Sequence, residues 1–417
     1  MFARLGNGAD HGGAFHRLQG LQLFIERAIP GTRHRDLFHQ GSVLPFGILA
    51  TSSVNSGCTQ DVNSGRNLIA LLWLEGGRAD QMTTRTYFVF SIFYAVFALA
   101  LSGMLLDDWS KLLPGATMAF EANISLVIRL LAVFFPCLLL GVIRTARAGR
   151  RGELMRLFAA LAGCVALQVG FLCVKSLIPA IVPYYADPLL ARLGRWLHFG
   201  QDAWMIAHSV PGGAFFSSLQ LVYVDFWLLP ALFLPVVLVV FDSDEGRVRR
   251  FTLMFVLCWI GLGNVAAILG SSVGPVFYDS IYGSDRFAQL NVALKESGII
   301  GGIVGQQQDF LLNSYRSGNF LIGSGISAFP SLHVAMATLF ALYLVDRSRK
   351  LMPLSAGYVI LVLFMSVYTG YHYAIDGYFS ILAVFLMHFA LRRLRFAAKE
   401  NYVLSDCQAA NGSLERL

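Results

Sequence analysis

The sequence predicts an all-α protein that crosses a membrane several times as one helical bundle. Of its 417 residues, 56% are hydrophobic and only 14% are charged, and the mean hydropathy is +0.60. A soluble chain of this length needs more surface charge and would suggest about two or three domains. Long apolar stretches provide the second observation, and the basic loops between them provide the third.

The first 81 residues differ from the rest of the chain. They are rich in Gly, Asn, Arg and His, and no stretch in them is long enough to span a membrane. The short apolar patch Val43–Ala50 lies too far from the N-terminus for a signal peptide. We expect residues 1–81 to be a poorly ordered extension, or to reflect a start site placed too early, because Met82 directly precedes the first long apolar run.

About eight candidate transmembrane helices follow, each a run of mostly apolar residues. The predicted spans are approximately 87–106, 123–144, 155–182, 217–241, 251–270, 329–345, 353–370 and 375–391. The last three are short, but short helices still cross where the bilayer thins or neighbours shield them. We divide this part into an N-terminal membrane region, 82–250, a core, 251–395, and a tail, 396–417.

The loop charges predict the orientation of the bundle. Every second span is followed by a basic cluster: Arg144, Arg147, Arg150 and Arg151; Arg247, Arg249 and Arg250; Arg347, Arg349 and Lys350; Arg392, Arg393, Arg395 and Lys399. Because Lys and Arg gather in cytoplasmic loops, we expect these loops and both termini in the cytoplasm. This suits a bacterial inner membrane, with a eukaryotic endomembrane as the alternative.

Two long loops then lie on the outer side. Residues 183–216 place Trp196 and Trp204 among apolar and charged residues, which predicts a pair of amphipathic helices at the membrane interface. Residues 271–328 run through a Gly-rich piece into the next span. No internal repeat of the kind found in many transporters is visible.

Several function classes find no support in the sequence. The formal net charge of +7 is explained by the cytoplasmic loops, so we expect no nucleic-acid partner. The six cysteines form no CxxC pair or Cys/His cluster, so we expect no metal and no cofactor. The expected partners are the bilayer and a membrane lipid substrate, and the oligomeric state stays open.

Two stretches place ionisable residues at the ends of predicted spans. Residues 327–336 read SAFPSLHVAM and residues 368–378 read YTGYHYAIDGY. The orientation puts His333, His372 and Asp376 on the outer face, and the spacing of four predicts that His372 and Asp376 share one face of a helix. Any one of them alone is compatible with packing or capping. Three together predict a site, because ionisable groups at membrane depth are costly.

This residue set suits phosphoryl transfer without a metal. His372, oriented by Asp376, would attack phosphorus and form a phospho-histidine. His333 would protonate the departing alcohol and then accept a proton from a second alcohol or from water.

The phosphoryl oxygens also need positive charge or hydrogen-bond donors. Ser331 lies at a helix N-terminus, and Arg316 is the nearest cationic candidate, with Lys295 and Arg286 as weaker ones. Tyr278 is placed at the outer mouth of the site, or in a plain turn.

Three further ionisable residues lie within apolar spans. They are Arg129, Lys175 and Asp225. We interpret them as structural pairs or as side chains that reach toward the membrane surface.

The motifs resemble those of a known superfamily. F-P-S-L-H at 329–333 and H-Y-A-I-D at 372–376 resemble the second and third signature motifs, P-S-G-H and S-R-x5-H-x3-D, of the type 2 phosphatidic acid phosphatases. Leu332 in place of Gly, and Tyr373 after the histidine, are similar to the inositol phosphorylceramide synthase branch. The resemblance covers roughly residues 255–392 and implies a helical bundle with a phosphatidic acid phosphatase type 2-like core, a lumenal or periplasmic site, and a phospho-histidine at His372.

The sequence departs from the superfamily pattern at two places. Ser366 stands where the third motif has its Arg, and SSVGPVFY (271–278) stands where the first motif, K-x6-R-P, is expected. Both departures remove phosphate-binding cations. Because the sphingolipid-synthase branch departs similarly, they favour a lipid phosphotransferase.

Three hypotheses follow. The leading one is a lipid phosphotransferase or phosphatase whose acceptor is a ceramide-like alcohol, a glycerolipid alcohol or water. The second is a lipid phosphatase acting on phosphatidic acid or an isoprenyl diphosphate. The third is a transporter or scaffold that reuses the fold without catalysis.

Overall fold

The computed structural model describes residues 79–105, 151–317 and 321–393, with isolated residues between 117 and 143. They belong to one compact unit, residues 63–417. The predicted extension up to residue 78, most of the second predicted span including Arg129, and the predicted tail lie outside the described residues. Helix α3 begins at Ala79, before Met82.

The described elements with assigned bounds are helical. In chain order they are α3 (Ala79–Leu105), α6 (Arg151–Ile181), α7 (Asp187–Leu197), α8 (Ala203–Ser209), α9 (Gly213–Ser218), η2 (Val222–Phe226), α10 (Trp227–Phe241), α11 (Glu245–Val256), η3 (Leu257–Ala266), α12 (Ala267–Leu269), α13 (Pro275–Tyr282), α14 (Ala288–Glu296), α15 (Ile303–Ser317), α16 (Leu332–Arg347), η4 (Arg349–Leu351) and α17 (Met352–Tyr368). A last helix covers Ala374–Arg393.

Six helical stretches within the described residues are long and apolar enough to cross a membrane. They are Thr83–Leu105, Gly152–Ile181, Gly213–Phe241, Glu245–Leu269, Arg349–Tyr368 and Ala374–Arg393. These confirm the predicted spans one, three, four, five, seven and eight. The predicted span 329–345 forms α16, whose 16 residues are fewer than the usual length of a membrane-spanning helix. The predicted number of eight is therefore not confirmed.

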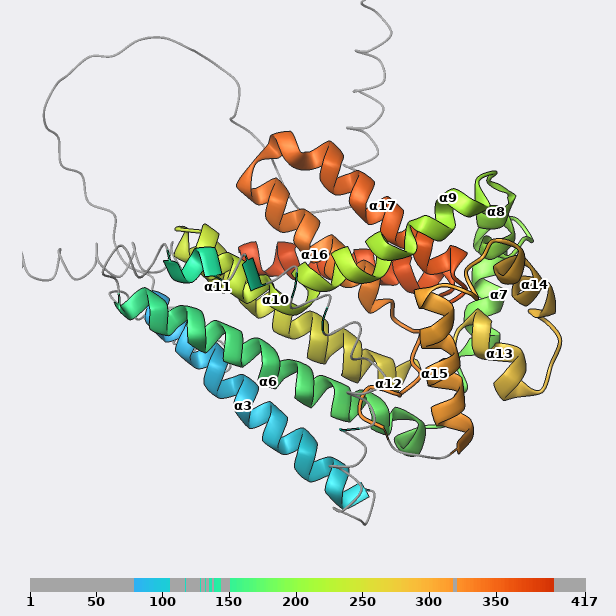
Figure 1. Ribbon diagram of the computed structural model, residues 1–417, viewed down its shortest axis with the longest axis horizontal. Helices are drawn as coiled ribbons and strands as arrows, with labels where there is room; N and C mark the ends of the chain where they lie inside the picture. The colour runs from blue at the N-terminus through green and yellow to red at the C-terminus, as the bar shows by residue number, and fades with distance from the viewer. Residues whose placement is uncertain are drawn as a thin grey trace, which may run out of the picture. The chain divides into compact units, whose positions relative to one another are not determined.

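Small residues let α3 pack closely along α6, as Figure 1 shows. A Cβ atom at Gly163 would lie 2.6 Å from the ring of Tyr87, and one at Gly170 would lie 2.7 Å from the ring of Tyr94. The two glycines are seven residues apart, so they lie on the same face of α6. Small residues commonly permit such approach between membrane helices.

Two of the apolar stretches contain π-helical turns. Segment η2 interrupts the stretch that ends at Phe241, and η3 interrupts the stretch that ends at Leu269. Such turns are frequent at functional sites because they redirect side chains within a helix. Here Tyr223 of η2 and Trp259 of η3 line the same cavity.

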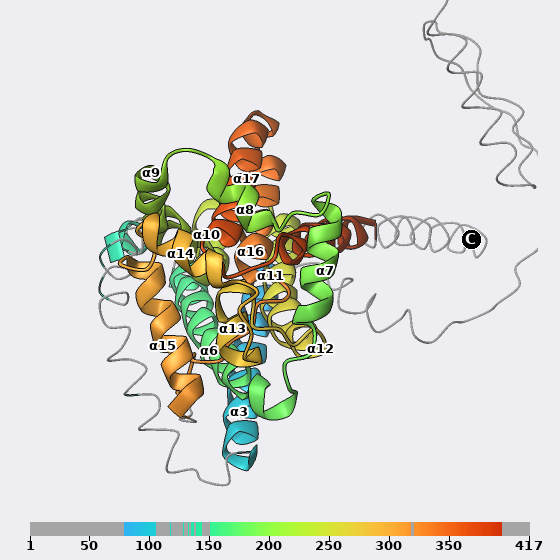
Figure 2. The same ribbon diagram turned by 90° about the vertical axis from the view of Figure 1, so that its right-hand side faces the viewer.

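The two long loops fold into short helices near one end of the bundle. Helices α7 and α8 confirm the predicted helix pair, although the structure does not test its place at a membrane interface. Residues 271–328 contain α13, α14 and α15, which the sequence did not predict. In the view of Figure 2, α13 lies between α15 and α7.

Candidate active site

Three chain segments meet beside the two histidines. They are residues 271–276, 326–331 and 370–376. The Ala328 amide donates to the carbonyl of Ser272 at 2.9 Å, which joins the first two segments. The Val276 amide donates to the carbonyl of Gly370 at 2.9 Å, which joins the first and third. These backbone hydrogen bonds fix the segments that carry the two histidines.

Gly274 allows the first segment to lie against the third. Its φ is +83°, and a Cβ atom there would lie 2.2 Å from the carbonyl oxygen of Tyr371. Both the left-handed conformation and the close approach require glycine. Any other residue at this position would push the segment away from the turn that holds His372.

A buried carboxylate, Asp187 at the start of α7, anchors the same segment. Its oxygens accept hydrogen bonds from the amides of Val273 and Gly274, both at 2.9 Å, and from the hydroxyls of Tyr282 at 3.1 Å and Tyr373 at 3.0 Å. Burial raises the pKa of Asp187, while these four donors favour its charged form. Burial and the nearby Asp187 charge also raise the pKa of Tyr373, so its hydroxyl remains a donor.

His372 has one ring nitrogen fixed by the backbone. Its Nδ1 lies 2.7 Å from the carbonyl oxygen of Ala328 and 3.6 Å from Oδ2 of Asp376. A carbonyl oxygen only accepts, so Nδ1 carries the proton in this hydrogen bond. In the neutral ring, Nε2 then carries the lone pair that a nucleophile needs.

Asp376 lies in the first turn of the helix that begins at residue 374, and His372 lies in the turn before that helix. The expectation that both residues share one face of a helix was therefore wrong. Asp376 Oδ2 instead accepts from the Tyr373 amide at 2.9 Å, in the manner of a capping box, while Oδ1 is buried without a hydrogen-bond partner. The carboxylate thus lies close to His372 because it caps the helix that follows.

His333 lies in the first turn of α16, between two aromatic rings. Its ring stacks on Tyr223 at 4.5 Å and packs against Trp227 at 4.2 Å between centroids. The Trp227 indole also donates to the His333 carbonyl at 2.8 Å. The two histidine rings are 5.8 Å apart, which places both within reach of one small group.

A cavity of about 920 Å³ opens onto both histidines. Its lining is mostly apolar and comes from α6, η2, α10, η3 and α15. Lys175 of α6 is the only Lys or Arg among the described residues that line it. The cavity therefore combines mostly apolar walls with a few polar side chains.

The predicted phosphate-binding residues Ser331, Arg316 and Tyr278 do not line this cavity, and neither does Ser366, which was also proposed for the phosphate site. Ser331 caps α16, its Oγ accepting from the Val334 amide at 3.4 Å. Tyr278 stacks on Tyr282, and Arg316 is exposed at the end of α15.

The weaker cationic candidates also lie elsewhere. Arg286 contacts Asp202 at 3.3 Å, and Lys295 is exposed at the end of α14. Neither side chain lines the cavity.

Ser366, which replaces the expected Arg, reaches the site indirectly. Its hydroxyl donates to the Val362 carbonyl at 2.8 Å and accepts from the Tyr223 hydroxyl at 3.3 Å. Tyr223 in turn stacks on His333. The position therefore supports an aromatic partner of His333.

Sequence reasoning missed Asp187, Tyr223 and Trp227 as parts of the site, because their contacts join segments far apart in the chain. It noted Lys175 but interpreted it as structural. One signal was available for Lys175: within α6 the only acidic residue, Glu153, lies 22 positions away and cannot pair with it.

Comparison with known proteins is consistent with this site. Residues 188–390 match the profile of the PAP2 superfamily. The match covers just under half of the chain and supports a similarity to the type 2 phosphatidic acid phosphatase superfamily. It includes His333, His372 and Asp376 but neither Asp187 nor Lys175. Searches of curated proteins and of solved structures found no match.

Proposed function

We propose that this protein is an integral membrane enzyme that transfers the phosphoryl head group of a lipid through a phospho-histidine at His372. The observation that carries the proposal is the hydrogen bond between His372 Nδ1 and the Ala328 carbonyl at 2.7 Å. It leaves Nε2 as the nucleophilic nitrogen, and His372 lines the cavity together with His333. The superfamily match supports the same class of chemistry.

In the first step, Nε2 of His372 attacks phosphorus and forms an N–P bond. The bond between phosphorus and the oxygen of the leaving alcohol breaks, and protonated His333 gives its proton to that oxygen. The imidazole of His372 becomes positively charged, and Asp376, 3.6 Å from Nδ1, stabilises this charge.

In the second step, an alcohol or water attacks the phosphorus. His333, now neutral, accepts the proton of the attacking oxygen, and the N–P bond breaks to regenerate neutral His372. An alcohol acceptor gives a new phospholipid, and water gives hydrolysis. The same residues therefore serve a transferase and a phosphatase, and the acceptor decides between them.

The cavity favours a lipid as the substrate. Its walls are mostly apolar, and His333, His372 and Lys175 are among the polar residues that line it. A pocket of this kind holds hydrocarbon chains while a few polar groups orient the head group.

The finer assignment is a transferase similar to the inositol phosphorylceramide synthases. It is supported by Leu332 and Tyr373 within the motifs and by Ser366 in place of the expected Arg. The outer, non-cytoplasmic face for the site follows from the basic clusters beside Arg247, Arg347 and Arg392. These features extend the proposal beyond the superfamily.

The test is to trap the intermediate. Purified protein is incubated with a phospholipid labelled at phosphorus and quenched in alkali, which preserves phospho-histidine. We expect label on the peptide that contains His372, and a loss of turnover of about 10³-fold or more in His372→Gln.

His198→Gln is the matched control. The Nδ1 of His198 also lies 2.7 Å from a backbone carbonyl, that of Gly194, but His198 does not line the cavity. This variant should keep its label and its rate. A His372→Gln protein that still turned over the lipid would disprove the assigned nucleophile, and label transferred only to water would favour the phosphatase.

A further inference from the structure

We propose that Lys175, in a helix outside the part of the chain that matches the superfamily, is the cation that holds the substrate phosphate beside His333 and His372. The inference rests on the proposed function and names the residue that replaces the charge missing at Ser366. It also limits the substrate to phosphates of low negative charge.

Lys175 lines the same cavity as His333 and His372. Among the described residues, no ion pair or hydrogen bond of its ammonium group is found. A cation without a counter-ion in an apolar cavity is costly, and an anionic ligand would compensate this cost.

The backbone around Lys175 is tied to the segment that leads into the site. The neighbouring Ser176 hydroxyl donates to the Leu321 carbonyl at 3.0 Å and accepts from the Gly323 amide at 2.8 Å. A Cβ atom at Gly325 would lie 2.1 Å from the Lys175 carbonyl oxygen, so the chain passes directly against this residue. Three residues after Gly325, the Ala328 carbonyl holds His372.

Pro179 makes room for this approach. Proline has no amide hydrogen, so it cannot donate to the carbonyl four residues earlier, which is that of Lys175. The Lys175 carbonyl thus lacks its usual helical donor on the side where Gly325 packs. Lys175 is therefore fixed relative to His372 through the backbone, as a residue that positions phosphate must be.

The charge count indicates the substrate class. Lys175 is the only Lys or Arg among the described cavity-lining residues, and a phosphodiester carries a single negative charge. A diphosphate carries about three charges near neutral pH, more than Lys175 and protonated His333 together compensate in an apolar space. The geometry therefore points to a lipid phosphodiester as the phosphoryl donor, in preference to a lipid diphosphate.

The experiment compares Lys175→Met, which removes the charge at similar length, with Lys175→Arg, which keeps it. The control is Arg156→Met, which removes a cation from the same helix at a position that does not line the cavity. Inorganic phosphate binding to the purified proteins is measured by calorimetry. Turnover is measured with a phosphodiester lipid and with a diphosphate lipid that has the same chains.

We expect Lys175→Met to weaken phosphate binding and to raise KM for the phosphodiester by about 10- to 100-fold, the effect of losing one charge-assisted hydrogen bond. Lys175→Arg should recover most of both, and Arg156→Met should match the wild type. The wild type should prefer the phosphodiester.

Each other outcome has a distinct meaning. If wild-type protein turns over the lipid and Lys175→Met binds phosphate equally well, the role of Lys175 is overturned while the proposed function stands. If phosphate binding depends on Lys175 but no lipid is turned over, the proposed function fails and the anion site stands. Faster turnover of the diphosphate lipid by the wild type would overturn the substrate class.

Discussion

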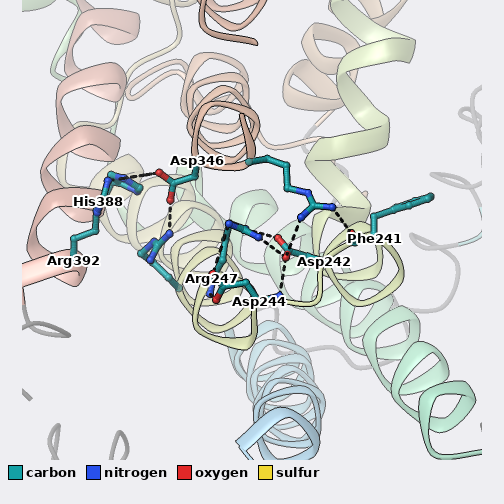
Figure 3. Close-up of polar contacts among 9 residues, drawn as sticks. Phe241, Asp242, Asp244, Arg247, Asp346, His388 and Arg392 are labelled. Atoms are coloured by element: carbon teal, nitrogen blue, oxygen red, sulfur yellow. Dashed lines mark hydrogen bonds and ion pairs between the residues drawn. The ribbon is translucent and has the colours of Figure 1, made fainter. Parts of the chain in front are cut away.

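The two ends of helix α16 treat charge in opposite ways. His333 lies in its first turn and Asp346 in its last, and 16 residues of α-helix span about 24 Å. At the Asp346 end, Figure 3 shows carboxylates surrounded by cations. Asp346 is paired with Arg250, with Arg392 at 3.6 Å and with His388 at 3.9 Å.

A second carboxylate extends this ion-pair end. Asp242, just after α10, accepts from Arg247 Nε at 2.5 Å and Nη2 at 2.7 Å, and Arg347 lies 3.9 Å away. Asp242 and Asp346 each face more than one basic group. Such an arrangement ties helix ends together and leaves little capacity for a ligand.

At the His333 end of α16, some polar and charged groups lack hydrogen-bond or ion-pair partners within the described ranges. Among the described residues, Asp376 Oδ1 has no hydrogen-bond partner, and the His333 ring is held by aromatic contacts with Tyr223 and Trp227. Lys175 lines the same cavity as His333, and within the part of the chain that the structure describes it has no counter-ion. Polar groups held in place but left unsatisfied are suited to a ligand, because the protein has already ordered them. The comparison separates ion pairs that hold the fold from groups kept ready for chemistry.

The largest expected effect comes from replacing one histidine at each end. His333→Gln should lower turnover by about 10²- to 10⁴-fold, the usual contribution of a general acid and base. His388→Gln, beside Asp346, should leave turnover within about twofold, since it touches no cavity residue. Initial rates with a lipid substrate in detergent micelles measure both.

A substrate with an acidic leaving group sharpens this prediction. Its leaving oxygen needs no proton, so the loss in His333→Gln should be much smaller than with an ordinary alcohol. An equal loss with both substrates would show that His333 acts by packing between Tyr223 and Trp227 rather than by proton transfer.

Neutralising one carboxylate at each end of α16 should give the next largest effect on turnover. Asp376→Asn keeps an oxygen that can accept from the Tyr373 amide, but it removes the charge near His372. We expect turnover to fall by about 10- to 10³-fold. The loss should stay at the lower part of this range if the Ala328 carbonyl alone keeps Nδ1 protonated.

Asp346→Asn is the matched change at the ion-pair end. It removes the counter-charge of Arg250, Arg392 and His388, so it should lower the free energy of unfolding by about 1–3 kcal/mol with little effect on turnover. Thermal unfolding and initial rates, measured on both variants, test the contrast. A large activity loss in Asp346→Asn, or a purely thermal effect of Asp376→Asn, would erase the distinction between the ends.

The helices and several residues at both ends of α16 could be predicted from the sequence. Apolar runs predicted six helical stretches that the structure contains, because membrane-length hydrophobicity is a strong local signal. The structure also brings His333, His372 and Asp376 together, and their catalytic roles stay predictions. The basic clusters at 247–250, 347–350 and 392–393 meet at the ion-pair end.

The contacts that the candidate site residues make could not be predicted from the sequence. Ser331 and Ser366 had the right chemistry, but their hydroxyls are used by the backbone of their own helices. Lys175 reaches the site only because residues 321–328 return to α6, more than 140 positions along the chain. Such non-local contacts depend on packing, which periodicity and composition do not report.

The smallest expected effect is the pH dependence of the ion-pair end. Burial favours a raised pKa for Asp242, but hydrogen bonds from Arg247 and from the Asp244 amide, with the Arg247 and Arg347 charges, hold it below its usual value. The folded state then binds fewer protons here than the unfolded state. Asp242 therefore contributes stability above the unfolded pKa of about 3.9, and this contribution is lost as the pH falls through the lower folded pKa.

Thermal unfolding of the wild type between about pH 5 and pH 3 should show this loss as a shift of a few degrees. Asp242→Asn should start from a lower midpoint and lose that part of the slope, whereas Asp309→Asn, an exposed acid on α15, should keep it. Identical slopes in all three proteins would mean that Arg247 and Arg347 do not hold Asp242 charged. Because Asp242 lies outside the cavity, none of these changes should alter phosphate binding at Lys175.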